Sequence, residues 1–337
     1  MEDCVAIDDE IASLEAQLQA ARLRRQQKQT ATTTAPGASL VSPLLSQQRQ
    51  HFLFLLSDSA LPLGSFAFSS GLESFLAHDK AAASAAASAS LVAAANALPR
   101  RLRSGPEAFA AFLPLSVSSY AHASLPFVLA AYDAACAVAP SPSLSLSLSS
   151  SSLPPGTAAI ETFTAALTLL DDTYDATIIC TVGRRASVAQ GRALLSIWER
   201  AFSPALIVPP LTDPLRPFAR LVKQSSNPPP GTLSDASAHM PPLFGAVARL
   251  TGLGRRQTAD VFVLSHIKAL LSAAVRANLL GPYQAQRLLA SALVQRLSTR
   301  AVDDAWDVPV EEAGQTVPVV DLWMGRHEML YSRIFNS

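Results

Sequence analysis

Apolar residues recur every three or four positions along most of the chain, which is the spacing of one face of an α-helix. Two such stripes follow one another in the middle of the sequence. They consist of Ile160, Phe163, Leu167, Leu170 and Tyr174, and of Val188, Gly191, Leu195, Trp198 and Phe202. Alternation with a period of two, which indicates a half-buried strand, is scarce. The pattern therefore predicts an all-α protein.

A third stripe lies nearer the C-terminus and contains Val261, Leu264, Ile267, Leu271, Ala274 and Val275. Gly281 and Pro282 interrupt it, and it resumes with Ala285, Leu288, Leu289, Ala292 and Leu297. Gly252 and Gly254 fall between stripes, where glycine commonly ends one helix before the next begins. Because each stripe has to be buried against others, we expect a helical bundle of about ten helices.

Compositionally biased segments divide the chain. Residues 1–45 are predicted to form a short amphipathic helix and a flexible linker. The helix has Ile7, Ile11, Leu14, Leu18 and Ala21 on one face, and the linker runs from Thr30 to Pro43. So short a helix is either marginal and solvated or paired with another helix. Residues 46–337 are predicted to form the main helical domain, with low-complexity insertions at about 79–104 and 139–157.

The two insertions differ in kind. Alanine dominates the first and favours helix, whereas repeated serine and proline in the second favour a loose loop. A further break, SSNPPPGT from Ser225 to Thr232, is expected to end the helix before it, because consecutive prolines cannot continue a helix.

Composition limits the class of protein. Hydrophobic residues make up 49% of the chain and charged residues 15%, so most of it can bury a large core. The 26 basic and 26 acidic side chains cancel, which argues against nucleic acid or an anionic membrane as a partner. Every long apolar stretch is interrupted well before about 20 residues, for example by His266 and Lys268, so no membrane-spanning helix is expected. The 3 cysteines are widely separated, and the N-terminus is acidic and does not resemble a signal peptide. Both features favour a cytoplasmic protein.

Residues that could carry catalysis or bind a metal are few and scattered. None of the 6 histidines has a second histidine at metal-ligand spacing, and phosphate-loop, dinucleotide and serine-elbow motifs are absent. Asp171, Asp172 and Asp175 lie close together and could serve acid/base chemistry or bind a hard cation. A solvated helix face is the favoured interpretation of these carboxylates. We expect no catalytic residue and no metal site in this chain.

Five segments, in a fixed order, resemble those of one protein family. They are FLFLLSDSALPLGSFAFSSGLESFLAH (52–78), GRRASVAQGRALLSIWERAF (183–202), HMPPLFGAVARLTGL (239–253), SAAVRANLLGPYQAQRLL (272–289) and RHEMLYSRIFNS (326–337). The Leu-Pro-x-Gly-x-Phe turn, the Arg-x-x-Ser-x-x-x-Gly-Arg helix and the His-Glu-x-Leu-Tyr-Ser-Arg tail are similar to those of urease accessory proteins of the UreF type. The N-terminal segment and the insertions, which the compact family pattern lacks, indicate a eukaryotic member such as a fungal one.

The resemblance implies an all-helical, non-enzymatic scaffold that is usually dimeric. It implies that the protein bridges a second accessory protein, UreD (also called UreH), to the GTPase UreG in the complex that loads nickel into apo-urease. A second copy of the chain, UreD, UreG and apo-urease are therefore the expected partners. No cofactor is expected to be held firmly, and nickel is expected to be handled by the complex.

Two other classes of function stay open. A generic helical adaptor unrelated to nickel would leave urease activation intact when its gene is deleted. A helical hydrolase that uses Ser57 or His78 would turn over a substrate without any partner.

Partner-binding residues are expected in two of the motifs and at one further arginine. In the first motif Pro62 and Gly64 shape a turn that offers Phe66, and Glu73 brings a carboxylate to the next helix. The tail has the aromatic and arginine side chains that interfaces favour, although a tail docked on its own core is the alternative. Arg276 is predicted to make a polar contact near the dimer or GTPase surface, or to snorkel along its helix. The full set is Pro62, Gly64, Phe66, Glu73, Arg276, Arg326, His327, Glu328, Tyr331, Ser332, Arg333 and Phe335.

Overall fold

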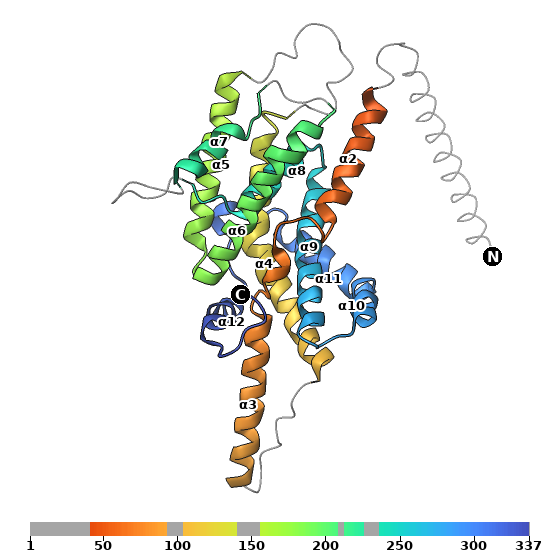
Figure 1. The fold of residues 1–337 in the computed structure, drawn as a ribbon, viewed down its shortest axis with the longest axis vertical. Coiled ribbons are helices and arrows are strands. Elements are labelled where there is room, and N and C mark those ends of the chain that lie inside the picture. The colour runs from red at the N-terminus through yellow and green to blue at the C-terminus, as the bar shows by residue number, and fades with distance from the viewer. Residues whose placement is uncertain (1–40, 93–103, 140–155, 208–211, 226–235, 337) are drawn as a thin grey trace, which may run out of the picture. The chain divides into compact units, whose positions relative to one another are not determined.

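The computed structural model describes residues 41–92, 104–139, 156–207, 212–225 and 236–336 (Figure 1). The chain divides into two units, residues 1–47 with 142–150 and residues 48–141 with 151–337. In the first unit only residues 41–47, the start of a helix, are described. The predicted N-terminal helix lies outside the described residues, as do residues 93–103 of the first predicted insertion and 140–155 of the second.

Within the described residues the structure contains eleven α-helices and no strand, which confirms the all-α prediction. The helices are α2 (Val41–Ser57), α3 (Leu72–Val92), α4 (Gly105–Ala135), α5 (Thr157–Thr177), α6 (Thr181–Ile197), α7 (Arg216–Ser225), α8 (Met240–Leu250), α9 (Arg255–Arg276), α10 (Pro282–Leu289), α11 (Ala292–Ala305) and α12 (Pro318–Arg326). Short 3₁₀ turns are η1 (Ser65–Ala67), η3 (Ser203–Ala205), η4 (Val310–Glu312) and η5 (His327–Met329), and η2 (Trp198–Phe202) is a π-helical turn.

Helix α8 is enclosed by the rest of the bundle. All 11 of its residues, Met240 to Leu250, are buried. The helix packs most extensively against α4 and also against α6, α9 and α5. A helix that is buried on every side has to be surrounded by other helices, so α8 sets the arrangement of its neighbours.

Two glycines allow the backbones around α8 to approach closely. A Cβ added to Gly245 of α8 would lie 1.9 Å from the carbonyl oxygen of Val128 in α4. A Cβ added to Gly191 of α6 would lie 2.0 Å from the carbonyl oxygen of Ala238, just before α8 begins. Both distances are far below a van der Waals contact, so any larger residue would force the helices apart.

The apolar stripes predicted from the sequence face the core. Their most fully buried members are Ile160, Phe163, Leu167, Tyr174, Leu195, Trp198, Phe202, Val261, Ile267, Leu271 and Ala274. The predicted breaks also fall where helices end. Gly254 precedes α9, Pro282 begins α10, and α7 ends at Ser225 beside the proline run. At the N-terminal side α2 begins at Val41, before the end of the predicted linker.

By length and composition alone, α4 and α9 are long and apolar enough to cross a membrane, contrary to the expectation from the sequence. Most of the apolar window of each helix is buried inside the protein, 67% in α4 and 56% in α9. Phe109, Phe112 and Phe127 of α4 and Phe262 of α9 are almost completely enclosed. Packing against neighbouring helices therefore accounts for the apolar sequences of both.

Gly245→Ala tests the close approach of α4 and α8. We expect it to lower the free energy of unfolding by about 3 kcal/mol, because one backbone has to move to admit the methyl group. Urea denaturation followed by circular dichroism measures the change. Gly314→Ala is the control, since its Cβ would meet no atom closer than 4.0 Å. Equal stability of the two variants would show that the helices do not touch at Gly245.

Candidate functional site

The segment before α3 folds into two tight turns. Gly64 has a φ of 73° and leads into η1, which places Phe66 at the surface. A second left-handed turn at Ser70 and Gly71 leads into α3, which carries Glu73 in its first turn. A Cβ on Gly71 would lie 3.2 Å from the backbone nitrogen of Met324, so this turn packs directly on α12. Only glycine combines this φ with so close a contact.

Glu73 holds the C-terminal segment of the chain in place. Its carboxylate accepts hydrogen bonds from His327 Nε2 at 2.9 Å, from the backbone N–H of Ile334 at 2.7 Å and from that of Phe335 at 3.2 Å. The His327 side chain is fully buried. These four residues form what we call the Glu73 clasp. Hydrogen bonds to an ionised acceptor are roughly twice as strong as neutral ones, so one carboxylate can fix the whole segment.

Arg276 strengthens the same region from α9. Its guanidinium lies 4.3 Å from the centre of the Phe335 ring, which is itself buried, and it donates a hydrogen bond to the backbone oxygen of Phe66. Desolvation lowers the pKa of Arg276 from its usual value, although a guanidinium stays charged at physiological pH. Three segments far apart in the sequence, around residues 66, 276 and 335, therefore meet at one place.

The clasp leaves large apolar side chains on the surface. Met329 is 79% exposed, Tyr331 is fully exposed, and Phe66, Leu322 and Ile334 are each more than 60% exposed. We call these five residues the C-terminal apolar surface. An ion pair between Arg185 of α6 and Glu328 at 2.8 Å ties the neighbouring turn to the bundle. Large exposed apolar side chains on a held segment are typical of a protein-binding surface.

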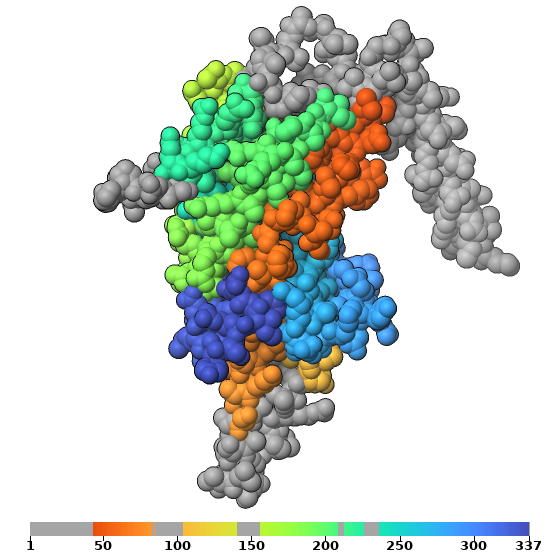
Figure 2. Space-filling view, viewed as in Figure 1, coloured from red at the N-terminus to blue at the C-terminus, as the bar shows by residue number. Residues whose placement is uncertain are grey.

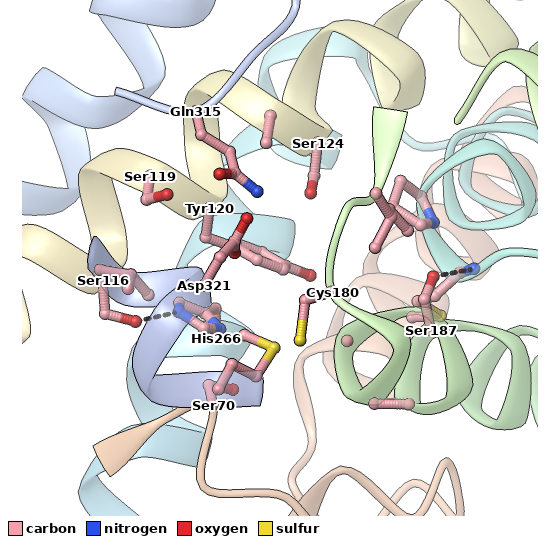
Figure 3. A pocket seen from close by; sticks show the side chains of 18 of the residues that line it. Ser70, Ser116, Ser119, Tyr120, Ser124, Cys180, Ser187, His266, Gln315 and Asp321 are labelled. Atoms are coloured by element: carbon pink, nitrogen blue, oxygen red, sulfur yellow. Dashed lines mark hydrogen bonds between the residues drawn. The ribbon is translucent and has the colours of Figure 1, made fainter. Parts of the chain in front are cut away.

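A pocket of about 130 Å³ lies beneath α12 (Figure 3). Among its lining residues are Ser116, Ser119, Tyr120, Ser124, Tyr174, Cys180, His266, Asp321 and Met324. Ser116 Oγ is 3.1 Å from His266 Nε2, and the Tyr120 ring stacks on the His266 ring with their centres 3.9 Å apart. Residues from α4, α5, α6, α9 and α12 all line it, so the pocket exists only in the assembled bundle.

Burial shifts the pKa values of His266 and Asp321, which line the pocket. It lowers the pKa of His266 to about 3, so the imidazole is neutral at physiological pH. It raises the pKa of Asp321 to about 6, and Oδ2 of this residue has no hydrogen-bond partner among the described residues. In the described part of the chain no Lys or Arg lines the pocket, so above the pKa of Asp321 no cationic side chain there compensates its carboxylate. No three His, Cys, Asp or Glu residues in the described part of the chain are grouped to hold a metal.

The solvated helix face predicted for the three aspartates is wrong for Asp171. Its side chain is completely buried and accepts backbone N–H groups of Ser237, Ala238 and His239 at 2.7, 3.0 and 2.6 Å. Those N–H groups precede α8 and would otherwise be buried without acceptors. The sequence did carry a signal, since Asp171 lies four residues after Leu167 on an apolar stripe.

Asp175 has a similar structural role. Its Oδ1 lies 2.7 Å from His239 Nε2 and also accepts a hydrogen bond from Arg184. Burial alone would raise the pKa of Asp175, but the hydrogen bonds and charges of Arg184 and His239 outweigh it and lower the pKa. The carboxylate thus stays ionised and joins α5, α6 and the start of α8. Of the three aspartates only Asp172 is exposed.

Comparison with known proteins decides the family. The sequence model of the UreF family matches residues 104–293. A protein of Schizosaccharomyces pombe described as an uncharacterised urease accessory protein UreF-like is 32% identical over 292 residues, which cover 87% of this chain and 99% of the relative. The chain belongs to the UreF family. Urease accessory protein 6 of Cryptococcus neoformans is 27% identical, over 87% of this chain and 98% of the relative. Urease accessory protein F of Arabidopsis thaliana is 27% identical, over 84% and 90% respectively.

Fungal and plant relatives that align over most of their length confirm a eukaryotic UreF family member. Membership supports a role in the maturation of urease as an accessory protein. The clasp and the C-terminal apolar surface lie outside the span matched by the family model, which ends at Leu293.

The structure brings together several of the predicted partner-binding residues of this UreF protein. Phe66, Glu73, Arg276, His327 and Phe335 meet in or beside the clasp, and the tail is docked on its own core. Of these only Phe66 presents a large apolar side chain to solvent. The remaining tail residues Arg326, Glu328, Tyr331, Ser332 and Arg333 are exposed, and their binding of a partner stays a prediction. Pro62 and Gly64 lie in the turn that leads to Phe66.

Glu73→Gln tests the clasp. An amide has one acceptor oxygen in place of two, so at least one of the three hydrogen bonds is lost. We expect about 2 kcal/mol of docking free energy to be lost, and the Phe335 amide to exchange its hydrogen about 30-fold faster. Hydrogen–deuterium exchange measures this directly. Glu311→Gln, at an exposed position, is the control. Unchanged exchange at residues 334–336 in Glu73→Gln would contradict the clasp.

Asp321→Asn tests the uncompensated charge. The pKa of Asp321 is about 6 in the folded protein, which is above its pKa in the unfolded chain. The side chain is therefore protonated at low pH and does not destabilise the fold there. As the pH rises through the two pKa values, the ionised carboxylate increasingly lowers the free energy of unfolding. We expect the variant to gain about 1 kcal/mol of unfolding free energy at pH 7.5, a figure reduced for partial solvent contact, and little at pH 4.5. Asp307→Asn, an exposed control, should show no such trend. A gain independent of pH would refute the assignment.

Proposed function

We propose that this protein acts in the cytoplasm as a non-enzymatic scaffold of urease maturation that bridges a UreD-type accessory protein and the GTPase UreG. It does so as a homodimer in the complex that loads nickel into apo-urease. Nickel is the cargo of that complex, and the chain holds no metal of its own firmly. Membership of the UreF family supports the role in maturation, whereas the bridging rests on the surfaces of the molecule.

The observation that carries the bridging role is the C-terminal apolar surface on a fixed support. The Glu73 clasp, the Arg276–Phe335 contact and the ion pair of Glu328 hold the segment without covering Tyr331, Met329 or Ile334. A surface that is already ordered loses little conformational entropy when a partner covers it. We assign this surface to the UreD-type protein.

A catalytic role is less well supported by the geometry. Ser116 and His266 lie within hydrogen-bond distance, as a nucleophile and its base would. A pKa of about 3 makes His266 a very weak base, however, and Tyr120 covers one face of its ring. Ser57, the nucleophile considered in the hydrolase alternative, bonds to the Phe54 carbonyl of its own helix. The pocket therefore favours the scaffold over a hydrolase.

Tyr331→Ala combined with Ile334→Ala tests the assignment of the C-terminal apolar surface. After co-expression with the cognate UreD-type protein and UreG, we expect the variant to bind the UreD-type protein at least about 30-fold more weakly, since exposed aromatic anchors often contribute 2 kcal/mol or more. Size-exclusion chromatography and titration calorimetry measure complex formation. Leu169→Ala changes a similarly exposed apolar residue on α5 and should bind normally.

Unchanged binding by the double variant would remove the surface from the proposal. Failure of the intact chain to bind either protein, together with normal urease activation in a deletion strain, would favour a generic helical adaptor instead.

A further inference from the structure

Asp321 brings an acidic group into the pocket beneath α12, and no Lys or Arg of the described residues lines that pocket. Its Oδ2 is buried and has no hydrogen-bond partner in the same part of the chain. By contrast, the carboxylates of Asp171 and Glu73 each accept three hydrogen bonds. A buried oxygen without a partner costs free energy, so a binding partner from outside the chain would stabilise it.

Helix α12 forms one wall of the pocket. It packs against α3, α4 and α6. Figure 2 shows the darker blue C-terminal segment, to which α12 belongs, at the surface between the green helices and the orange α3. Asp321 lies in the first turn of α12 and is half-buried. Its side chain is directed toward the same space as Ser119, Tyr120 and Gln315 (Figure 3). The carboxylate therefore points into the pocket.

The other lining groups suit a cation that carries an apolar tail. Ser70 and Ser119 bring hydroxyl groups, whose oxygen atoms can accept hydrogen bonds from an ammonium group. Apolar atoms nevertheless make up the larger part of the lining. The larger apolar side chains are Phe68, Ile178, Met240, Val320 and Met324. An apolar wall with a few convergent polar groups and a carboxyl group of shifted pKa is typical of small-molecule sites.

The size of the pocket restricts the ligand. A volume of about 130 Å³ is below the roughly 300–1,000 Å³ of pockets that take drug-sized molecules. The pocket is partly open to solvent, so a small molecule can enter it. A metal ion fits less well, because no three His, Cys, Asp or Glu residues of the described chain are grouped to hold one. A short alkylammonium ion has both the donors for the carboxylate and the tail for the apolar wall.

We propose that the pocket beneath α12 binds a small organic cation, a protonated primary amine with a short apolar tail, whose ammonium group pairs with the Asp321 carboxylate. This site is separate from the C-terminal apolar surface, and the inference goes beyond the proposed function without depending on it. Pairing compensates the lone carboxylate, so the bound cation also strengthens the attachment of α12 to the bundle.

Four other ionisable side chains line the pocket, and they come from the helices around Asp321 or directly precede one. They are Tyr120 of α4, Tyr174 of α5, Cys180 before α6 and His266 of α9. Helix α3, which also packs on α12, contributes no lining residue. Burial lowers the pKa of His266 to about 3, raises that of Tyr174 to about 12 and raises that of Tyr120 well above its usual value. These three side chains therefore stay neutral between pH 5.0 and pH 7.5.

The test is a calorimetric titration of the full chain with n-propylammonium chloride and with 1-propanol, its neutral counterpart of similar size. At pH 7.5 and constant ionic strength we expect the cation to bind at least about 30-fold more tightly. At pH 5.0 cation binding should be about tenfold weaker, because a proton then occupies most Asp321 carboxyl groups while the amine stays charged.

Three variants locate the binding. Asp321→Asn keeps the shape of the side chain and removes its charge, so it should lose the preference for the cation over 1-propanol. Asp307→Asn, at an exposed position, should keep both the preference and its dependence on pH. Cys180→Ser should also keep both, which assigns the pH dependence to Asp321 and not to the thiol.

Equal binding of n-propylammonium and 1-propanol by the wild type, or no binding of either, overturns the inference. A preference for the cation that survives in Asp321→Asn overturns it as well. Equal or tighter binding of potassium or of a divalent metal ion would show that the site does not select an organic cation. None of these results affects the proposed function, which is tested separately by the binding of the UreD-type protein and UreG.

Discussion

A helix with no exposed residue has to be enclosed on every side, and α8 imposes this constraint on the fold. The helices around it can come close enough only where a side chain is missing, as at Gly245 and Gly191. The start of α8 also needs acceptors for the backbone N–H groups that precede it, and Asp171 supplies them from α5. The positions of α4, α5 and α6 follow from these contacts, and with them the walls of the pocket.

Carboxylates removed from water stabilise the fold at two positions of this protein and destabilise it at a third. Asp171 and Glu73 are each surrounded by donors, and each holds a segment distant in sequence. Among the described residues Asp321 has no hydrogen-bond partner for its buried Oδ2, and burial raises its pKa to about 6. The same physics applies to all three, since a charge removed from water is stabilised only where hydrogen bonds replace the water. The first two therefore strengthen the fold, whereas Asp321 weakens the packing of α12 at neutral pH.

The C-terminal segment, which carries the C-terminal apolar surface, is less deeply buried in the bundle than α8 is. Helix α12 covers the pocket and meets the rest of the bundle partly through the backbone contact at Gly71. Only Val320 of α12 is fully buried, whereas every residue of α8 is, and less deeply buried elements open more readily than a core helix. The Glu73 clasp, the Arg276–Phe335 contact and the Arg185–Glu328 ion pair hold this segment, and none of them involves α8, so a partner can bind the segment without disturbing that helix.

The sequence by itself determined the fold class and several of the breaks between helices. Apolar spacing and Gly or Pro breaks are local properties of the chain, so the stripes from Ile160 to Phe202 and the break at Gly281 could be read directly. The motif order also indicated the family. Only the tertiary structure decided that Glu73 meets His327 and that Arg276 meets Phe335, because those pairs are separated by 254 and 59 residues and no local pattern encodes them. The spacing of Asp171 after Leu167 could have indicated its burial, but only the tertiary structure identified its donors, which come from a segment 66 to 68 residues away.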